Sequence, residues 1–276
     1  MFSRILTVAG QEIRIGIRNR WILLAAMILA VFSLALALLG SAPAGTLGVD
    51  RLTITVASLA SLSVYLVPLI ALLLAFDAIC GEIERGTLLM TLSCPISRVE
   101  FLIGKAVGHT LVLAFALVVG YGLTAGLLVA AGYGSLSGLA DFVRLIATSV
   151  LLGVCFLATG YVLSSLTRQS RTAAAASVAV WLMMVVLYDL ALLGALVANP
   201  SGVFASDVFP YAILLNPADA FRLFNLAALG ANDLVGGMAG VADALPFDPL
   251  LALGSLTVFA GLAMAGSALL IKRIAP

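Results

Sequence analysis

Residues 77–105, with the sequence DAICGEIERGTLLMTLSCPISRVEFLIGK, hold the densest group of side chains that could do specific chemistry. The charged side chains of residues 82–85 fall within one helical turn, Gly86 permits a bend or a helix end, and residues 87–92 are mostly apolar. An apolar run ringed by charges is typical of a docking surface. We therefore expect this segment to bind another protein. The alternative is a solvated loop whose charges only prevent translocation.

The second half of this segment carries signals for a helix end and a new helix start. The residue before a proline avoids the α region, so Cys94-Pro95 predicts the end of a helix. Ser97 and Glu100 form the S-x-x-E pattern of a capping box, in which each residue satisfies a free N–H group at a helix start. This pattern predicts a new helix that begins near Ser97 and leads into the next apolar stretch.

Other candidate groups for catalysis, nucleotide binding or metal binding are sparse. Gly104-Lys105 lacks both the preceding glycine and the following Ser or Thr of the G-x-x-x-x-G-K-[ST] phosphate loop. His109 is the only histidine, and the three cysteines form no C-x-x-C pair. We therefore expect no catalytic residue, no metal site and no cofactor bound by this chain.

Asp189 is the one carboxylate well inside an apolar run, and charges in lipid are costly enough to make it a candidate functional residue. It lies 17 residues after Thr172, roughly 26 Å along a helix at 1.5 Å per residue, so near the outer end of a span. We expect its carboxylate to be solvated there or to cap a following helix. A role in proton relay is the alternative.

The connection from residue 199 to residue 249 is apolar in parts and rich in glycine and proline. It predicts short re-entrant or interfacial helices, broken at Pro210 and Pro217, that form an outer gate. Asp219 and Arg222 are three residues apart and are expected to pair on one helix face. The residues assigned to the gate or to an outer partner are Asp189, Asn216, Pro217, Asp219 and Arg222.

The elements that must position these groups are membrane helices. Of the 276 residues, 63% are hydrophobic and 10% are charged, against roughly 45–50% and ~25% in soluble domains. Continuous apolar runs select helices over a β-barrel. The stretches that reach the roughly 20 residues needed to cross a bilayer are 21–40, 54–76, 106–131, 142–166, 172–198 and 250–271. We expect an all-α polytopic membrane protein with six transmembrane helices, in a single domain over residues 1–276.

The basic residues are divided unequally between the two sides of these spans. Eleven lie on the N-terminal side and three on the other, so the positive-inside rule places both termini and residues 77–105 in the cytoplasm. Residues 1–20 alternate apolar and basic side chains with a helical period, which predicts an amphipathic helix in the cytoplasmic interface. The net charge of +1 offers no field to attract nucleic acid, so none is expected as a partner.

These features together resemble a known family. The interfacial helix, the six spans and the pattern E-x-E-R-G-T…P-x-S-R…GK between the second and third spans are similar to the permease subunits of ABC-2-type ABC transporters. More narrowly, residues 76–105 and the sequence LLNPADAFRL at 214–223 resemble the permeases of the transporter that matures the copper centres of nitrous oxide reductase. The resemblance implies a cytoplasmic coupling helix in residues 77–105. It assigns mechanical coupling roles to Glu82, Glu84, Arg85, Gly86, Thr87 and Pro95.

The resemblance also implies partners and a location. It implies two cytoplasmic ATPase subunits that carry ATP and Mg²⁺, a second copy of this chain, and a periplasmic accessory protein, all at a lipid bilayer that is a bacterial inner membrane. The chain would not be an enzyme, but would couple hydrolysis by the ATPase to export or to mechanical signalling for copper-site maturation. The resemblance leaves the cargo open, as a sulfur species, copper or no substrate at all. The alternatives are a stand-alone secondary transporter, which would need intramembrane charges near the midplane, and an intramembrane enzyme, which would need more than one histidine.

Overall fold

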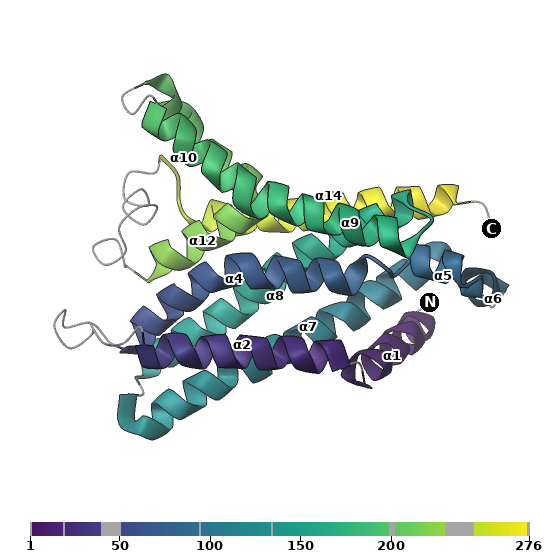
Figure 1. Ribbon diagram of the computed structural model, residues 1–276, viewed down its shortest axis with the longest axis horizontal. Helices are drawn as coiled ribbons and strands as arrows, with labels where there is room; N and C mark the ends of the chain where they lie inside the picture. Colours follow the sequence, from purple (N-terminus) through teal and green to yellow (C-terminus); the bar gives the residue numbers. More distant parts are fainter. Residues whose placement is uncertain are drawn as a thin grey trace.

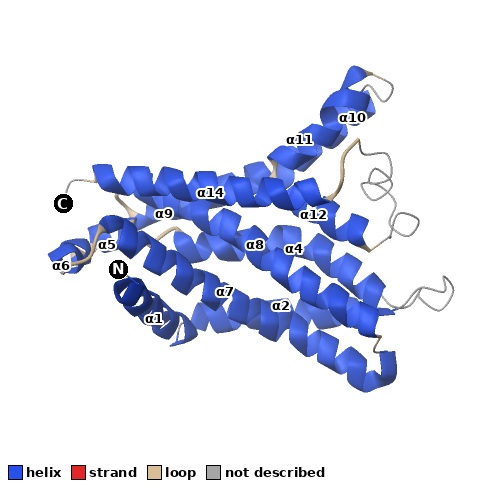
Figure 2. Ribbon diagram, turned by 180° about the vertical axis from the view of Figure 1, so that it is seen from behind, coloured by secondary structure: helices blue, strands red, loops and turns tan. Residues whose placement is uncertain are grey.

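The computed structural model describes residues 2–18, 20–39, 51–93, 95–133, 135–198, 202–229 and 246–274. Within these ranges the chain forms helices joined by turns, and no strand occurs (Figures 1 and 2). The α-helices are α1 (Phe2–Arg18), α2 (Arg20–Leu39), α4 (Arg51–Ala75), α5 (Cys80–Glu84), α6 (Thr87–Ser93), α7 (Arg98–Leu128), α8 (Leu136–Leu166), α9 (Ser170–Trp181), α10 (Tyr188–Ala198), α11 (Phe209–Leu215), α12 (Pro217–Ala228) and α14 (Leu250–Arg273). Three π-helical segments accompany them, namely η1 (Val129–Tyr133), η2 (Leu182–Leu187) and η3 (Phe204–Val208).

Five helical segments among the described residues are long and apolar enough to cross a membrane, and a sixth is reached when α1 and α2 are counted as one bent pair. The two members of that pair meet at 64°. The expectation of an all-α polytopic membrane protein is confirmed. The predicted connections at 41–53 and 199–249 lie partly outside the described residues, since residues 40–50 and 230–245 are not among them.

Two helices begin well before the apolar stretches that predicted them. α7 begins at Arg98, eight residues before the apolar stretch 106–131, as the capping box at Ser97 predicted; the fourth span was expected from residue 142, but α8 begins at Leu136. Both starts are set by serine caps, because Ser97 accepts a hydrogen bond from the N–H of Glu100 and Ser135 accepts one from Gly138. Hydropathy marks the part of a helix that suits lipid, whereas the cap decides where the helix begins.

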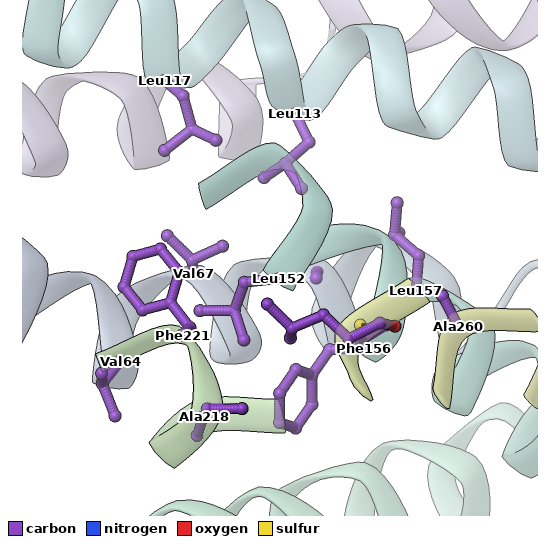
Figure 3. Close-up of a cluster of buried hydrophobic side chains, with 14 of the residues drawn as sticks. Val64, Val67, Leu113, Leu117, Leu152, Phe156, Leu157, Ala218, Phe221 and Ala260 are labelled. Atoms are coloured by element: carbon purple, nitrogen blue, oxygen red, sulfur yellow. The ribbon is translucent and has the colours of Figure 1, made fainter. Parts of the chain in front are cut away.

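The centre of the bundle is made by α4, α7 and α8, with α2 packed on α7 and α14 packed on α8 (Figure 1). Figure 3 shows the place where α4, α7, α8, α12 and α14 meet around Phe156 and Phe221, whose side chains are fully buried. Side chains from α12 therefore belong to the same core as the spans. The α12 part of the connection between the fifth and sixth spans is thus built into the bundle.

The two ends of the bundle carry different elements. The beginning of α1, the helices α5 and α6 and the C-terminal end of α14 lie at one end, whereas α10, α11 and α12 lie toward the other (Figures 1 and 2). The segment expected to dock a partner and the segment expected to form a gate are therefore separated along the bundle. Any functional link between them has to pass through the helices.

Candidate functional site

The chain between α4 and α7 folds into two short helices, α5 and α6, that extend from one end of the bundle (Figure 1). Gly86 joins them with φ of +72°, a left-handed conformation that costs other residues roughly 1–2 kcal/mol. Leu88 is buried, whereas Leu89 and Met90 are 56% and 74% exposed. These two side chains, which we call the docking face, leave apolar surface on an otherwise charged projection.

Behind α5, charged side chains from three helices meet with little access to solvent. The Lys105 Nζ of α7 lies 2.5 Å from Glu12 Oε1 of α1 and 3.2 Å from Glu82 Oε1 of α5. The side chains of Lys105, Glu12 and Glu82 are 6%, 10% and 19% exposed. Glu82 Oε2 also accepts a hydrogen bond from the hydroxyl of Thr87, the first residue of α6. We call Glu12, Lys105 and Glu82 the inner charge network. It joins the segment between α4 and α7, residues 76–97, which we call the docking segment, to α1 and α7.

The second oxygen of Glu12 extends the network to α8. Glu12 Oε2 lies 3.2 Å from His109 Nε2, and His109 Nδ1 lies 2.8 Å from the hydroxyl of the fully buried Tyr161. Burial alone would raise the pKa of Glu12, but the hydrogen bond from His109 and the charge of Lys105 outweigh it and lower this pKa to about 2. Glu12 is therefore ionised, and because a carboxylate only accepts, His109 Nε2 carries the hydrogen in this contact.

Two glycines on α7 let α1 come close enough to form this network. A Cβ atom on Gly108 would lie 2.6 Å from Glu12 Cβ and 3.0 Å from the carbonyl oxygen of Ala9. A Cβ atom on Gly104 would lie 2.6 Å from Val8 Cβ. Small residues spaced four apart allow such close backbone contact between helices in membranes. The spacing of Gly104 and Gly108 thus positions Glu12 opposite Lys105.

Glu84 and Arg85, which were expected to act at the docking surface, make bonds within the chain. The Glu84 carboxylate accepts hydrogen bonds from the backbone N–H and the hydroxyl of Ser170, at 3.0 and 2.7 Å, and so caps the start of α9. Arg85 Nη1 lies 3.3 Å from Asp77 Oδ2, in the turn between α4 and α5. Glu84 thus attaches the docking segment to α9, whereas Arg85 makes an ion pair within the segment. Their contact with an ATPase stays a prediction.

A serine from α8 holds the other end of α5. The Ser164 hydroxyl lies 3.0 Å from the backbone nitrogens of both Ile79 and Cys80, at the break between α4 and α5. Those N–H groups would otherwise lack a partner, because the first N–H groups of a helix have none within it. The docking segment is thereby attached to α8 as well as to α1, α7 and α9.

The predicted helix restart after the docking segment is confirmed. Ser97 and Glu100 form a complete capping box, with Ser97 Oγ accepting from the Glu100 N–H at 3.1 Å and Glu100 Oε2 accepting from the Ser97 N–H at 2.8 Å. Pro95 lies exposed in the bend before it. Cys94, which was expected to end the preceding helix together with Pro95, lies outside the described residues.

Near the other end of the bundle, α11 and α12 form a hairpin whose turn at Asn216 is buried. The Asn216 side chain accepts a hydrogen bond from the Ala218 N–H and donates to the Met184 carbonyl at 2.6 Å and to Asp219 Oδ2 at 2.8 Å. Met184 belongs to the π-helical η2, whose wider turn leaves carbonyls open to other donors. The expectation of short helices is confirmed. The predicted break at Pro217 is confirmed, because α11 ends at Leu215 and Pro217 is the first residue of α12, where no N–H donor is needed.

The expected pairing of Asp219 with Arg222 is wrong. Arg222 Nη1 lies 3.1 Å from Asp189 Oδ2, and the two side chains are 12% and 16% exposed. Asp219 instead accepts the Asn216 amide one helical turn earlier. The expectation of a solvated or capping Asp189 is also wrong, because α10 continues to Ala198 and the carboxylate is ion-paired. The ion pair connects the fifth span to the hairpin, a contact between distant residues that spacing could not reveal.

The residues that the sequence reasoning missed are those of the network behind α5. Glu12 carries a usable signal, because it sits beside Val8, Ala9 and Gly16 on the buried side of an amphipathic helix, where a charge needs a partner. Lys105 and His109 were seen only as a failed phosphate loop and a lone histidine. Tyr161 and Ser164 carry no signal of their own, since tyrosine and serine are common within spans.

Known proteins resemble this chain along nearly its whole length. A family model described as ABC-2 family transporter protein matches residues 6–271. The chain is 40% identical over 261 residues to the probable ABC transporter permease protein NosY of Pseudomonas aeruginosa, with 94% of each chain covered. It is 39% identical over 246 residues to the protein of the same name from Stutzerimonas stutzeri, with 88% of this chain and 89% of the relative covered. The chain therefore belongs to the ABC-2 family of transporter proteins and is a multi-pass permease subunit of the inner membrane.

Proposed function

We propose that this permease subunit couples ATP hydrolysis by a separate cytoplasmic ATPase to export or mechanical signalling across the inner membrane, in the maturation of the copper centres of nitrous oxide reductase. The chain acts as a mechanical element and not as an enzyme. ATP and Mg²⁺ bind to the partner ATPase. The copper-centre role is supported by the resemblance of residues 76–105 and 214–223 to permeases of that system, and by the name NosY carried by two relatives.

The observation that carries the proposal is the inner charge network. The side chains of one lysine and two carboxylates are largely buried there. Separating them would leave an unpaired buried charge, which is costly, so the three side chains resist being pulled apart. A push on α5 is therefore passed to α1 and α7 as a rigid-body displacement, rather than being absorbed by a yielding loop. A loop that served only to prevent translocation would not need a buried ion-pair network that joins it to α1 and α7.

The exposed surfaces fit the proposed assembly of two ATPases and two permease chains. The docking face on α6 offers apolar side chains for an ATPase to cover. In the most apolar stretch of the fifth span only 11% of the residues are buried within one chain, against 56% in the fourth. The exposed surface of the fifth span is therefore available for contact with a second copy of the chain. Two-fold dimers are the commonest symmetric assembly. At the other end, the exposed side chains Tyr211 and Leu215 of α11 offer surface for the periplasmic accessory protein that the proposal includes.

The test of the proposal is co-purification of the ATPase with the tagged chain from membranes. Glu84→Ala and Arg85→Ala are poor probes, because Glu84 caps the start of α9 and Arg85 makes an ion pair with Asp77, so both changes also break contacts within the chain. Leu89→Asp is sharper, since Leu89 is exposed and its loss removes docking surface without disturbing the core. The matched control is Leu136→Asp, an exposed leucine at the start of α8.

We expect a nucleotide-hydrolysing subunit to be recovered with the wild-type chain and with Leu136→Asp, and to be lost with Leu89→Asp. Equal recovery with both variants would show that α6 does not dock the ATPase. Recovery of no ATPase with the wild-type chain would overturn the proposed function itself.

A further inference from the structure

Arg98 fastens the C-terminal end of α14 to the start of α7. Its Nη1 lies 3.2 Å from the carbonyl oxygen of Ile271, 3.0 Å from that of Lys272 and 2.6 Å from that of Ile274. The last carbonyls of a helix have no partner within it and carry partial negative charge. One guanidinium thus satisfies several of them and links two helices whose residues are more than 170 positions apart in the chain.

The other end of this link is the docking segment. Arg98 is the first residue of α7, directly after the capping box residue Ser97, and lies only five positions after Ser93, where α6 ends. The capping box fixes the direction in which α7 starts, so Arg98 has little freedom to move independently of the start of α7. A displacement of α6 and of the start of α7 is therefore delivered to the end of α14.

Along its length α14 reaches the hairpin of α11 and α12. Ala260 of α14 lies in the cluster of Figure 3 with Ala218 and Phe221 of α12. Ala260 precedes Ile271 by 11 residues, roughly 16 Å of helix at 1.5 Å per residue. α14 is one continuous α-helix from Leu250 to Arg273, with no proline and no π-helical break, so it connects the two places directly; Gly266-Ser267 is the point between them where it bends most easily.

We propose that α14 is a direct link between the docking segment and the outer hairpin, and that Arg98 is the positioning residue that attaches it. Movement at α6 shifts the carbonyls held by Arg98, and α14 transfers the shift to α12. This inference rests on the proposed function, because it presupposes an ATPase that moves the docking segment. It differs from the inner charge network, whose side chains belong to α1, α5 and α7 and not to α14.

The experiment measures amide hydrogen exchange by mass spectrometry on the complex of the full chain with its ATPase in lipid nanodiscs, with and without ATP and vanadate. The readout is the nucleotide-dependent difference in exchange over residues 209–228. The variants are Arg98→Gln, which removes the guanidinium, and Arg98→Lys, which keeps one charged donor group. The matched control is Arg273→Gln, which removes the same charge from an exposed position on the end of α14.

In the wild-type complex and in Arg273→Gln we expect a nucleotide-dependent difference in the hairpin. Arg98→Gln should lose that difference while it still binds the ATPase and hydrolyses ATP, and Arg98→Lys should keep part of it. The inference is overturned if Arg98→Gln retains the full difference. It is also overturned if the Arg98 variants alter exchange equally with and without nucleotide, or lose the ATPase, because Arg98 would then serve only the stability of the fold.

The two proposals can fail separately. A wild-type complex that contains the ATPase but shows no nucleotide-dependent change over residues 209–228 refutes the link through α14 and leaves the docking proposal standing. A wild-type chain that recovers no ATPase refutes both.

Discussion

Replacing Lys105 with methionine removes the only cation of the inner charge network and leaves Glu12 and Glu82 facing each other with little solvent. Methionine keeps an unbranched apolar chain of similar length, so the change is mainly one of charge. Breaking a buried ion pair by removing one partner costs about 3–5 kcal/mol, because the remaining charge stays buried without compensation. Since Glu12 keeps its hydrogen bond with His109, we expect a loss near 3 kcal/mol, the lower end of this range.

A double-mutant cycle separates this interaction from general damage. Glu12→Gln alone leaves Lys105 paired with Glu82 3.2 Å away, so it should cost only about 1.5–3 kcal/mol, the range for hydrogen bonds to charged groups. Once Lys105 is methionine, Glu12→Gln removes an unpaired buried charge and should cost less, or even restore stability. The coupling energy of the cycle should therefore fall between about 0.5 and 3 kcal/mol.

The assay is unfolding of the purified chain in mixed micelles with an increasing fraction of denaturing detergent, followed by circular dichroism, for the wild type, both single variants and the double variant. A loss below about 1 kcal/mol for Lys105→Met would place the network among exposed ion pairs. Additivity of the two changes within about 0.5 kcal/mol would show that Glu12 and Lys105 do not interact. Either result would refute the argument that the network is rigid.

Two further predictions concern the contacts of Glu12, and a third concerns the ion pair between Asp189 and Arg222. The pKa of Glu12 is lowered from its usual 4.5 to about 2, so its contribution to stability should be present above pH 4.5 and lost as the pH falls toward 2. The midpoint of thermal unfolding should therefore fall between pH 6 and pH 3, and Glu12→Gln should reduce this dependence on pH. Gly108→Val should displace α1, because even a Cβ atom there lies 2.6 Å from Glu12 Cβ, and should lower the midpoint of thermal unfolding while Gly122→Val, which faces open space, does not. Arg222→Met leaves Asp189 without its ion-pair partner and should lower the free energy of unfolding by about 3 kcal/mol. Adding Asp189→Asn to the same chain should recover part of that loss. An equal loss in the double variant would show that the pair is not a stabilising contact.

The helices could be predicted from the sequence because lipid imposes one rule on all of them. Every backbone polar group must be paired within the membrane, so an apolar run of about 20 residues is almost sufficient evidence for a helix. The apolar stretches alone gave the starts of α2, α9 and α14 to within two residues, whereas the start of α7 was predicted from the local motif of Ser97 with Glu100. The capping serine before α8 went unused, and the start of that helix was placed too late.

The candidate site could be predicted only in its local part. The segment between α4 and α7 was found because its charges and its proline break are visible within 30 residues. Its attachment to the bundle could not be found in this way, because Glu12, Ser164 and Ser170 reach it from other parts of the chain. Glu84 illustrates the consequence, since a carboxylate that seemed free for a partner is already bound to the start of α9.

At the outer end, spacing along a helix suggested the wrong partner for Arg222. Residues three apart can pair on an exposed helix, but in a packed bundle a side chain from a neighbouring helix competes for the same guanidinium. Here Asp189 of α10 takes that place. Short-range rules therefore hold for caps and turns, and become unreliable for charges that face another helix.

The central claim, that a cytoplasmic ATPase docks on α6 of this permease, is tested most directly by site-specific photo-crosslinking in intact membranes. A benzophenone amino acid placed at Met90, which is 74% exposed, should crosslink to the ATPase subunit, while the same group at Leu136, which is 88% exposed, should not. A crosslink from position 90 that is absent from position 136 is the result we predict. Crosslinks to lipid or to other proteins but not to the ATPase from position 90 would contradict the claim.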